Sequence, residues 1–226
     1  MKRHTTLLLT TLLLGMPACD KGTENKKEAQ AANKPTPAAE KPEPAREAIE
    51  PGEPAKPEAR TVASGLDLGM RFAAFDIVNC DSGDKYCQVC QYGSSPKIMA
   101  VGTIDDEQFK KDLQDLDAIV AKYGDDKVKA FAVIAESKDG ALVTPLAGAA
   151  DLQAKAKALK EELGINMPIV VPAPEGAGVN GIFEDHYQVK QSRTIMFADG
   201  KNEVKYTAVA PENYQALDEA IKAAVG

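Results

Sequence analysis

A long tract with almost no large apolar side chains restricts where this chain can fold. Between Asp20 and Arg60 the sequence consists mainly of Ala, Pro, Glu and Lys. Such a composition buries too little apolar surface to offset the entropy lost on folding, so we expect a disordered tether over 19–61. We therefore expect one folded domain at 62–226. The tract's prolines favour semi-rigid polyproline-type conformations and stand at positions 35, 37, 42, 44, 51, 54 and 57.

The first residues indicate export. A basic start at residues 1–4 precedes an apolar run from Thr5 to Met16, which is shorter than the roughly 20 residues needed to span a bilayer. Its end, Met16-Pro17-Ala18-Cys19, resembles the bacterial lipoprotein box. The resemblance implies that residues 1–18 are a cleaved signal peptide and that Cys19 carries the lipid, palmitate included, that anchors the chain to a membrane. The alternatives are an ordinary cleaved signal peptide and an uncleaved anchor.

These features predict a domain held outside the cytoplasm, in the periplasm of a bacterial cell envelope.

The charge balance argues against a nucleic-acid partner, because 27 basic residues face 34 acidic ones and the net charge is −7. Residues 176–181 fit G-x-G-x-x-G, but the long helix required by a dinucleotide site does not follow them. Gln91 directly after Cys90 excludes the covalent haem motif. We therefore expect no cofactor.

Hydrophobic spacing in the C-terminal part predicts alternating strands and helices. Turn residues at 198–202 predict a hairpin between the last two strands. Thr103 or Asp106 can cap the first helix, Gly164 can end the second, and Pro211 precedes the third. The expected strands are Met70–Val78, Lys97–Gly102, Lys129–Ala135, Met167–Val171, Arg193–Ala198 and Glu203–Val209, and the expected helices are Phe109–Tyr123, Leu152–Leu163 and Tyr214–Ala224.

This order is β-α-β-α-β followed by β-β-α, with an extra strand in front. Alternating strands and helices imply parallel pairing, to which the final hairpin adds antiparallel strands. The order resembles the thioredoxin-like fold of the redoxin type, and the segment 187–200 resembles the family's approach to its fourth strand. The expected fold class is therefore α/β, a three-layer thioredoxin-like fold around a central mixed β-sheet.

Cys87-Gln88-Val89-Cys90 is the strongest chemical signal in the domain. Cysteines at this spacing support thiol–disulfide exchange when one thiolate is stabilised, and an exported location permits a disulfide. In the thioredoxin family the thiols follow the first core strand and open a helix. Here Thr103-Ile104-Asp105-Asp106 stands there, so the resemblance implies a CxxC pair displaced upstream. The run from Tyr86 to Pro96 resembles secreted bacterial thioredoxin-like proteins.

Two further features depart from the family pattern. Residues 91–96 are too short and too rich in Gly and Pro for a helix, so we expect no helix dipole from this segment. Lys85 or Lys97 could supply the positive charge instead. Arg193 replaces the proline that precedes Thr in the family and is normally cis. Peroxiredoxins carry an arginine near this point, but they need a cysteine after the first core strand, so peroxidase activity is not expected.

The leading hypothesis is exchange with protein thiols, protein disulfides or a redox partner protein. In it Cys87 attacks, as the more exposed thiol, Cys90 resolves the mixed disulfide, and Cys80 is a third thiol able to shuttle. The alternative is a non-catalytic binding or scaffold domain, in which Cys87–Cys90 or Cys80–Cys90 is a structural disulfide. A third hypothesis groups Cys80, Cys87, Cys90 and His186 as a Cys₃His metal site.

Overall fold

The computed structural model describes residues 61–138, 141–143, 149–173 and 185–226. None of the helices in these ranges is long and apolar enough to cross a membrane. The strands are β1 Ile77–Asn79, β2 Lys85–Tyr86, β3 Lys97–Gly102, β4 Lys129–Ile134, β5 Glu136–Lys138, β6 Ala141–Val143, β7 Ile169–Pro172, β8 Thr194–Ala198 and β9 Val204–Val209. The helices are α1 Gln88–Tyr92, α2 Glu107–Tyr123, α3 Ala149–Leu163 and α5 Gln215–Val225.

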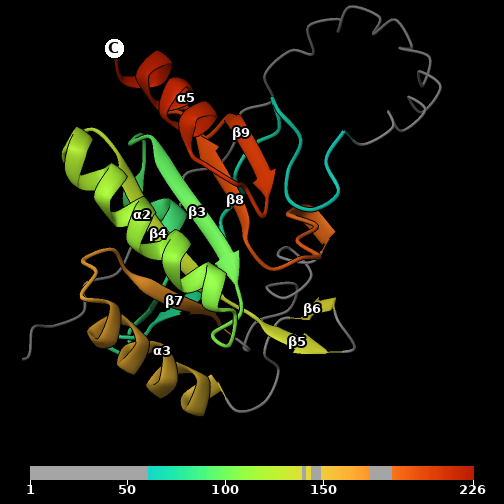
Figure 1. Cartoon of the computed structure of the whole chain (residues 1–226), viewed down its shortest axis with the longest axis vertical. Helices are drawn as coiled ribbons and strands as arrows, with labels where there is room; N and C mark the ends of the chain where they lie inside the picture. Colours follow the sequence, from blue (N-terminus) through green and yellow to red (C-terminus); the bar gives the residue numbers. More distant parts are fainter. Residues whose placement is uncertain (1–60, 139–140, 144–148, 174–184) are drawn as a thin grey trace, which may run out of the picture. The chain divides into compact units, whose positions relative to one another are not determined.

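A seven-stranded mixed sheet in the order β2-β1-β7-β4-β3-β8-β9 forms the centre of the fold (Figure 1). β3, β4 and β7 are parallel neighbours, whereas β8, β9 and β1 run antiparallel to the strands beside them. The chain crosses from β3 to β4 through α2 and from β4 to β7 through α3, in the same direction along the sheet. Right-handed crossovers therefore place both helices on one face. The predicted α/β class with a mixed sheet is confirmed.

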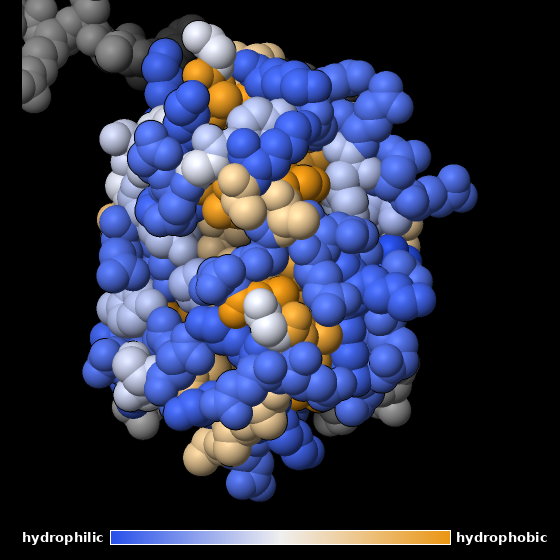
Figure 2. Space-filling model, turned by 60° about the vertical axis from the view of Figure 1, so that its left-hand side comes forward, coloured by the Kyte–Doolittle hydropathy of each residue, from blue (hydrophilic) through white to orange (hydrophobic). Residues whose placement is uncertain are grey.

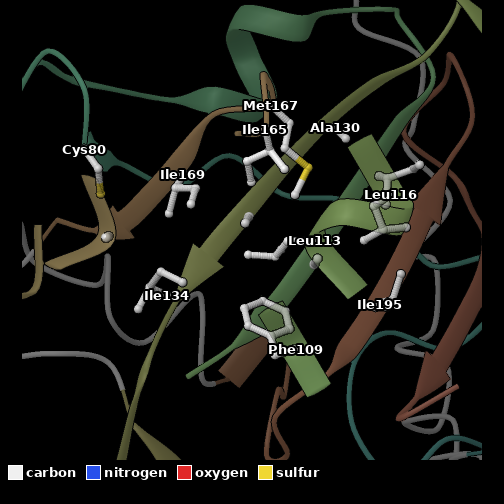
Figure 3. Close-up of a cluster of buried hydrophobic side chains, with 14 of the residues drawn as sticks. Cys80, Phe109, Leu113, Leu116, Ala130, Ile134, Ile165, Met167, Ile169 and Ile195 are labelled. Atoms are coloured by element: carbon white, nitrogen blue, oxygen red, sulfur yellow. The ribbon is translucent and has the colours of Figure 1, made fainter. Parts of the chain in front are cut away.

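The face under α2, α3 and α5 is closed by one buried apolar cluster (Figure 3). Side chains alternate across β3, so that Ile98 and Ala100 face this cluster while Met99 and Val101 face the other side. The α2 residues expected from the spacing, Phe109, Leu113 and Leu116, are fully buried in it. The helices contribute these core side chains because their apolar residues recur at intervals of three and four.

The opposite face is covered mainly by irregular chain and α1. Its buried cluster includes Leu66 and Phe72 from the segment before β1, Val89 from α1, and Tyr187. The Tyr187 ring meets Phe72 edge-on with centroids 5.7 Å apart, and its hydroxyl donates to the Ala73 carbonyl at 2.5 Å. Helices on one face, the sheet, and this covering segment form three layers.

The helix ends follow the sequence signals. Asp106 caps α2, its carboxylate accepting from the backbone N–H groups of Gln108 and Phe109 at 3.1 Å. Gly164 has φ +63 directly after α3, a conformation that glycine adopts without strain. The prediction of a strand over Met70–Val78 is only partly confirmed, because β1 begins at Ile77 and Arg71 instead forms an isolated bridge with Glu203, the residue before β9.

A buried ion pair joins α2 to the segment before β8. Arg193, which we expected to begin this strand, precedes it with φ +59. Its Nε donates to Asp112 at 2.6 Å, and its NH2 group donates to Asp112 at 3.1 Å and to the Pro211 carbonyl at 3.1 Å. Only 2% of the Asp112 side chain is exposed. Arg193 therefore ties α2, the start of β8 and the approach to α5 together.

Removing the Asp112 carboxylate should destabilise the domain strongly, because the largely buried Arg193 side chain, 16% exposed, would lose its anionic partner. We expect Asp112→Ala to lower the free energy of unfolding by about 3–5 kcal/mol. Urea denaturation with the cysteine pair kept oxidised measures the change. The control is Asp125→Ala, which removes a pair to Lys129 from a carboxylate that is 76% exposed and should cost no more than about 1 kcal/mol. Equal losses in both variants would contradict this prediction.

Candidate functional site

The two cysteines of the CxxC pair form a disulfide at the start of α1. The Cα atoms of Cys87 and Cys90 are 5.2 Å apart. Cys87 is the N-cap of α1, and its sulfur accepts a hydrogen bond from the Cys90 amide at 3.1 Å. The expectation that this segment forms no helix is therefore wrong: one short helix begins between the two cysteines and ends at Tyr92. Cys87 is half-buried and Cys90 is exposed, the reverse of the predicted order.

Tyr92 fixes the end of α1 on the sheet face opposite α2. Its hydroxyl donates to the Ala130 carbonyl of β4 at 2.9 Å, and its ring meets Phe131 edge-on at 5.9 Å between centroids. Val89, in the middle of α1, is buried in the same cluster. The helix is thus held by its apolar side while Cys90 remains accessible.

A chain of polar side chains runs along the start of α1. Asn79 donates to the Tyr86 hydroxyl at 2.8 Å, and this hydroxyl donates to Gln88 at 2.9 Å. Gln88 in turn donates to Gln91 at 3.3 Å. Gln88 is only 1% exposed, so its amide oxygen is satisfied inside the protein rather than by solvent. Sequence spacing singled out the two cysteines but not this network, whose residues are ordinary surface types.

Lys85 and Lys97 are the two candidates for a positive charge near the cysteines, and Lys97 is the one that contacts the C-terminal end of α1. Lys97 is fully buried, and its ammonium donates to the Gly93 carbonyl at 2.7 Å and to the Asn202 side chain. Burial lowers the pKa of Lys97, and the charge of the neighbouring Asp199 carboxylate offsets part of this shift. Lys85 is exposed in β2.

The structure does not bring Cys80 to the other two cysteines. Cys80 lies beside Ile169 in the cluster on the α2 and α3 face (Figure 3), whereas Cys87 packs against the cluster on the opposite face. Its thiol is free and 2% exposed. Burial, together with the Asp81 carboxylate, raises the pKa of Cys80 to about 12, against a smaller opposing effect of Lys160. A thiol of this kind is a poor nucleophile at neutral pH.

The notional Cys₃His site does not assemble. His186 is half-buried, and its Nε2 lies 2.8 Å from the Arg71 carbonyl. Within the described ranges, no three or more His, Cys, Asp or Glu side chains gather closely enough to hold a metal ion. The expected signal peptide, Cys19, the expected tether up to residue 60 and the 176–181 glycine motif lie outside the described residues.

The start of α2 contains a closed hydrogen-bond network and no thiol. The Ser192 hydroxyl donates to Asp106 at 2.7 Å and accepts from the Thr103 amide at 3.3 Å. Arg193 is next in sequence, and the described residues contain no cis peptide bond. The polar side chains at this edge are therefore bonded to one another, and the two bonded cysteines lie on the other face of the sheet.

A surface groove of 490 Å³ lies next to the end of α1, where Tyr92 forms part of its wall. The face of the molecule shown in Figure 2 is mainly hydrophilic, and apolar side chains show in a few small patches. The remaining groove wall comes from α2, the connection after it, the start of β4 and the residues before β7: Asp117, Val120, Ala121, Gly124, Asp125, Lys129, Ala130, Asn166, Met167 and Pro168.

Several solved structures with a similar arrangement of elements are thiol–disulfide proteins. A thiol-disulfide isomerase from Corynebacterium glutamicum aligns with a TM-score of 0.55 and 12% identity, covering 71% of this chain and 99% of that one. The thioredoxin domain of a thiol-disulfide oxidoreductase from Bacteroides vulgatus gives 0.53 and 12%, with the same coverages. The fold is thioredoxin-like. A thiol:disulfide interchange protein of the thioredoxin family from Chlorobium tepidum gives 0.51 and 14%, again covering 71% and 99%.

At these identities the likeness establishes the fold alone. No protein-family model matches the sequence, and no curated protein matches it. Any activity of this chain therefore depends on its own cysteines and their surroundings.

The burial of Cys80 predicts how the three domain cysteines differ in reactivity. After reduction, we expect iodoacetamide at about pH 8 to modify Cys87 and Cys90 while Cys80 resists, because its reactive thiolate is scarce below its raised pKa. Mass spectrometry of the native and the urea-unfolded protein measures the labelling. Cys80 should react only in the unfolded sample. Rapid labelling of Cys80 in the native protein would contradict its assigned burial.

Proposed function

We propose that this protein exchanges disulfides with other proteins outside the cytoplasm, through Cys87 and Cys90, while a lipid on Cys19 tethers it to a membrane. The observation that carries the proposal is the Cys87–Cys90 disulfide at the start of α1, with the exposed Cys90 and with the Cys90 amide directed at the Cys87 sulfur. The thioredoxin-like fold supports it, since the thiol–disulfide proteins named above share that fold.

The chemistry requires no group beyond the two thiols and a partner disulfide. The Cys87 thiolate attacks one sulfur of the partner, forming a mixed disulfide and releasing the partner's other sulfur as a thiolate. The Cys90 thiolate then attacks the Cys87 sulfur, which frees the partner's second thiolate and closes the Cys87–Cys90 bond. Two electrons pass to the partner, and the reverse sequence oxidises a partner dithiol.

The choice of Cys87 as the attacking thiol rests on its hydrogen bond. A backbone N–H that donates to sulfur favours the thiolate over the thiol, and the thiolate is the nucleophile. The Cys90 amide makes this contact at 3.1 Å in the oxidised form. Cys90 suits the resolving role because its Cα lies only 5.2 Å from that of Cys87, within reach of the Cys87 sulfur of a mixed disulfide. Cys80, buried on the opposite face, takes no part in this scheme.

A purely structural disulfide would contribute little here. The bond closes a loop with a sequence separation of 3, and loops this short remove only about 2 kcal/mol of unfolded-state entropy. Val89, Gln88 and Tyr92 already hold α1 to the sheet. The alternative to disulfide exchange is a non-catalytic scaffold domain, and the experiment below distinguishes the two.

The deciding experiment is a glutathione titration of the full chain in detergent, with mass-spectrometric quantification of the peptide that contains both cysteines. We expect a Cys87–Cys90 potential between roughly −270 and −120 mV, the range of working exchange proteins. A bond more reducing than about −300 mV would resist glutathione and would assign the scaffold role instead.

Substitution of the resolving thiol should trap the partner. We expect Cys90→Ser to accumulate a mixed disulfide through Cys87 in a cell extract, because no second thiolate remains to release it. Non-reducing electrophoresis and mass spectrometry identify the bonded cysteine. Cys87→Ser should trap far less, and the matched control Cys80→Ser should behave like the unsubstituted chain. Trapping that is equal in Cys87→Ser and Cys90→Ser would contradict the assigned order of attack.

The membrane tether is tested separately. We expect radiolabelled palmitate to be incorporated into the wild-type chain and to be absent from Cys19→Ser, which lacks the residue that would carry the lipid. Fractionation of the expressing bacterium should find the wild type with membranes and the variant displaced from them. If Cys19→Ser is labelled and fractionates with membranes as the wild type does, the chain is attached to the membrane in some way other than through a lipid on Cys19.

A further inference from the structure

Lys97 is a fully buried cation that the proposed exchange chemistry does not use. It is the first residue of β3, opposite Ala198 of β8 and Lys129 of β4. Its exposed fraction is 0%. Burying an ammonium group is costly unless hydrogen bonds replace its water, so the partners of Lys97 show which structure the burial stabilises.

One partner of Lys97 belongs to the helix that carries the cysteines. The ammonium donates to the carbonyl of Gly93, the C-cap of α1, at 2.7 Å. The Gly93 amide donates in turn to the Cys90 carbonyl at 3.1 Å. Gly93 has φ +51, a left-handed conformation that ends the helix. Lys97 thus holds the residue at which α1 terminates.

The other partner belongs to the rigid turn between β8 and β9. Lys97 also donates to the Asn202 side chain. The Asp199 carboxylate fixes this turn by accepting from the amides of Lys201 at 2.8 Å and Glu203 at 3.0 Å. The turn lies directly against the α1–β3 connection, since a Cβ on Gly200 would be 2.7 Å from a backbone oxygen of that connection. Lys97 therefore ties α1 to a well-braced part of the sheet.

The tie matters most when the disulfide is broken. A helix of five residues is not stable by itself in water, so α1 depends on its attachments. In the oxidised form the disulfide closes its first turn covalently. In the reduced form that brace is absent, and only side-chain and backbone contacts keep the Cys90 amide directed at the Cys87 sulfur.

We propose that Lys97 is a positioning residue for the Cys87–Cys90 pair: it holds α1 in place after reduction and so stabilises the reduced form relative to the disulfide. This inference rests on the proposed exchange function. It implies that Lys97 contributes more to the stability of the reduced protein than to that of the oxidised protein. Lys97 must then also shift the thiol–disulfide equilibrium of the pair toward the reduced form.

The test is the Lys97→Met variant of the full chain, which keeps the length of the side chain but removes its charge and donors. We expect the equilibrium constant for reduction by dithiothreitol to fall by up to about fivefold, the limit reached if the bond from Lys97 to Gly93 contributes its full free energy in the reduced form and none in the form already braced by the disulfide. Urea midpoints of both redox forms should show the reduced protein losing more stability. Lys129→Met is the matched control, because Lys129 pairs with Lys97 in register but bonds at the surface to Asp125.

The outcomes are separable. An unchanged equilibrium constant in Lys97→Met, with both redox forms destabilised equally, would overturn the inference and leave only a structural role. If Lys97→Met does not fold, Asn202→Gly replaces it, because glycine keeps the turn's φ of +63 and removes one acceptor. A smaller shift in the same direction is expected, and no shift overturns the inference. Wild-type resistance to glutathione would refute the exchange function, while the dithiothreitol comparison would still decide the role of Lys97.

Discussion

The packing of α2 on the β3–β4 pair is the contact on which the rest of the domain depends. The Phe109 ring lies so close to Gly102, the last residue of β3, that a Cβ there would come within 2.6 Å of it. Glycine at this position lets the helix approach the end of the strand, and Phe109 is fully buried as a result. The close approach sets the path of the crossover to β4. The second crossover and the antiparallel strands are added on either side of this parallel pair.

The two faces of the sheet then have different tasks. The face under α2, α3 and α5 is a continuous apolar core that contains Cys80 and carries the Arg193–Asp112 pair near its edge. The other face has a thinner cover, to which α1, the helix between β2 and β3 in the chain, brings the bonded cysteines. Because α1 is short, its position is set by neighbours distant in sequence: Ala130 at its end and the Asn202 turn through Lys97.

Much of the fold was predictable, and the reason is periodicity. α2, α3 and α5 are long enough for three- and four-residue spacing to show, and β3, β4, β8 and β9 were located within about one residue at each end. β2 and α1 are too short to carry a period, so residue spacing does not predict the helix that begins between the cysteines. The CxxC spacing identified the bonded pair. No local pattern predicts the burial of Lys97, because Asn202, which accepts its hydrogen bond, lies 105 residues further along the chain.

The separation of Cys80 from the other cysteines bears on how an exported chain would mature. Three thiols that emerge unfolded into an oxidising compartment can pair in three ways, and two of those pairings would trap Cys80 in a wrong bond. The native bond joins cysteines three residues apart, so its closure needs almost no chain search. Once the core forms, Cys80 is enclosed and withdrawn from thiol chemistry. Local closure of this bond and enclosure of Cys80 would together favour the native pairing during oxidative folding.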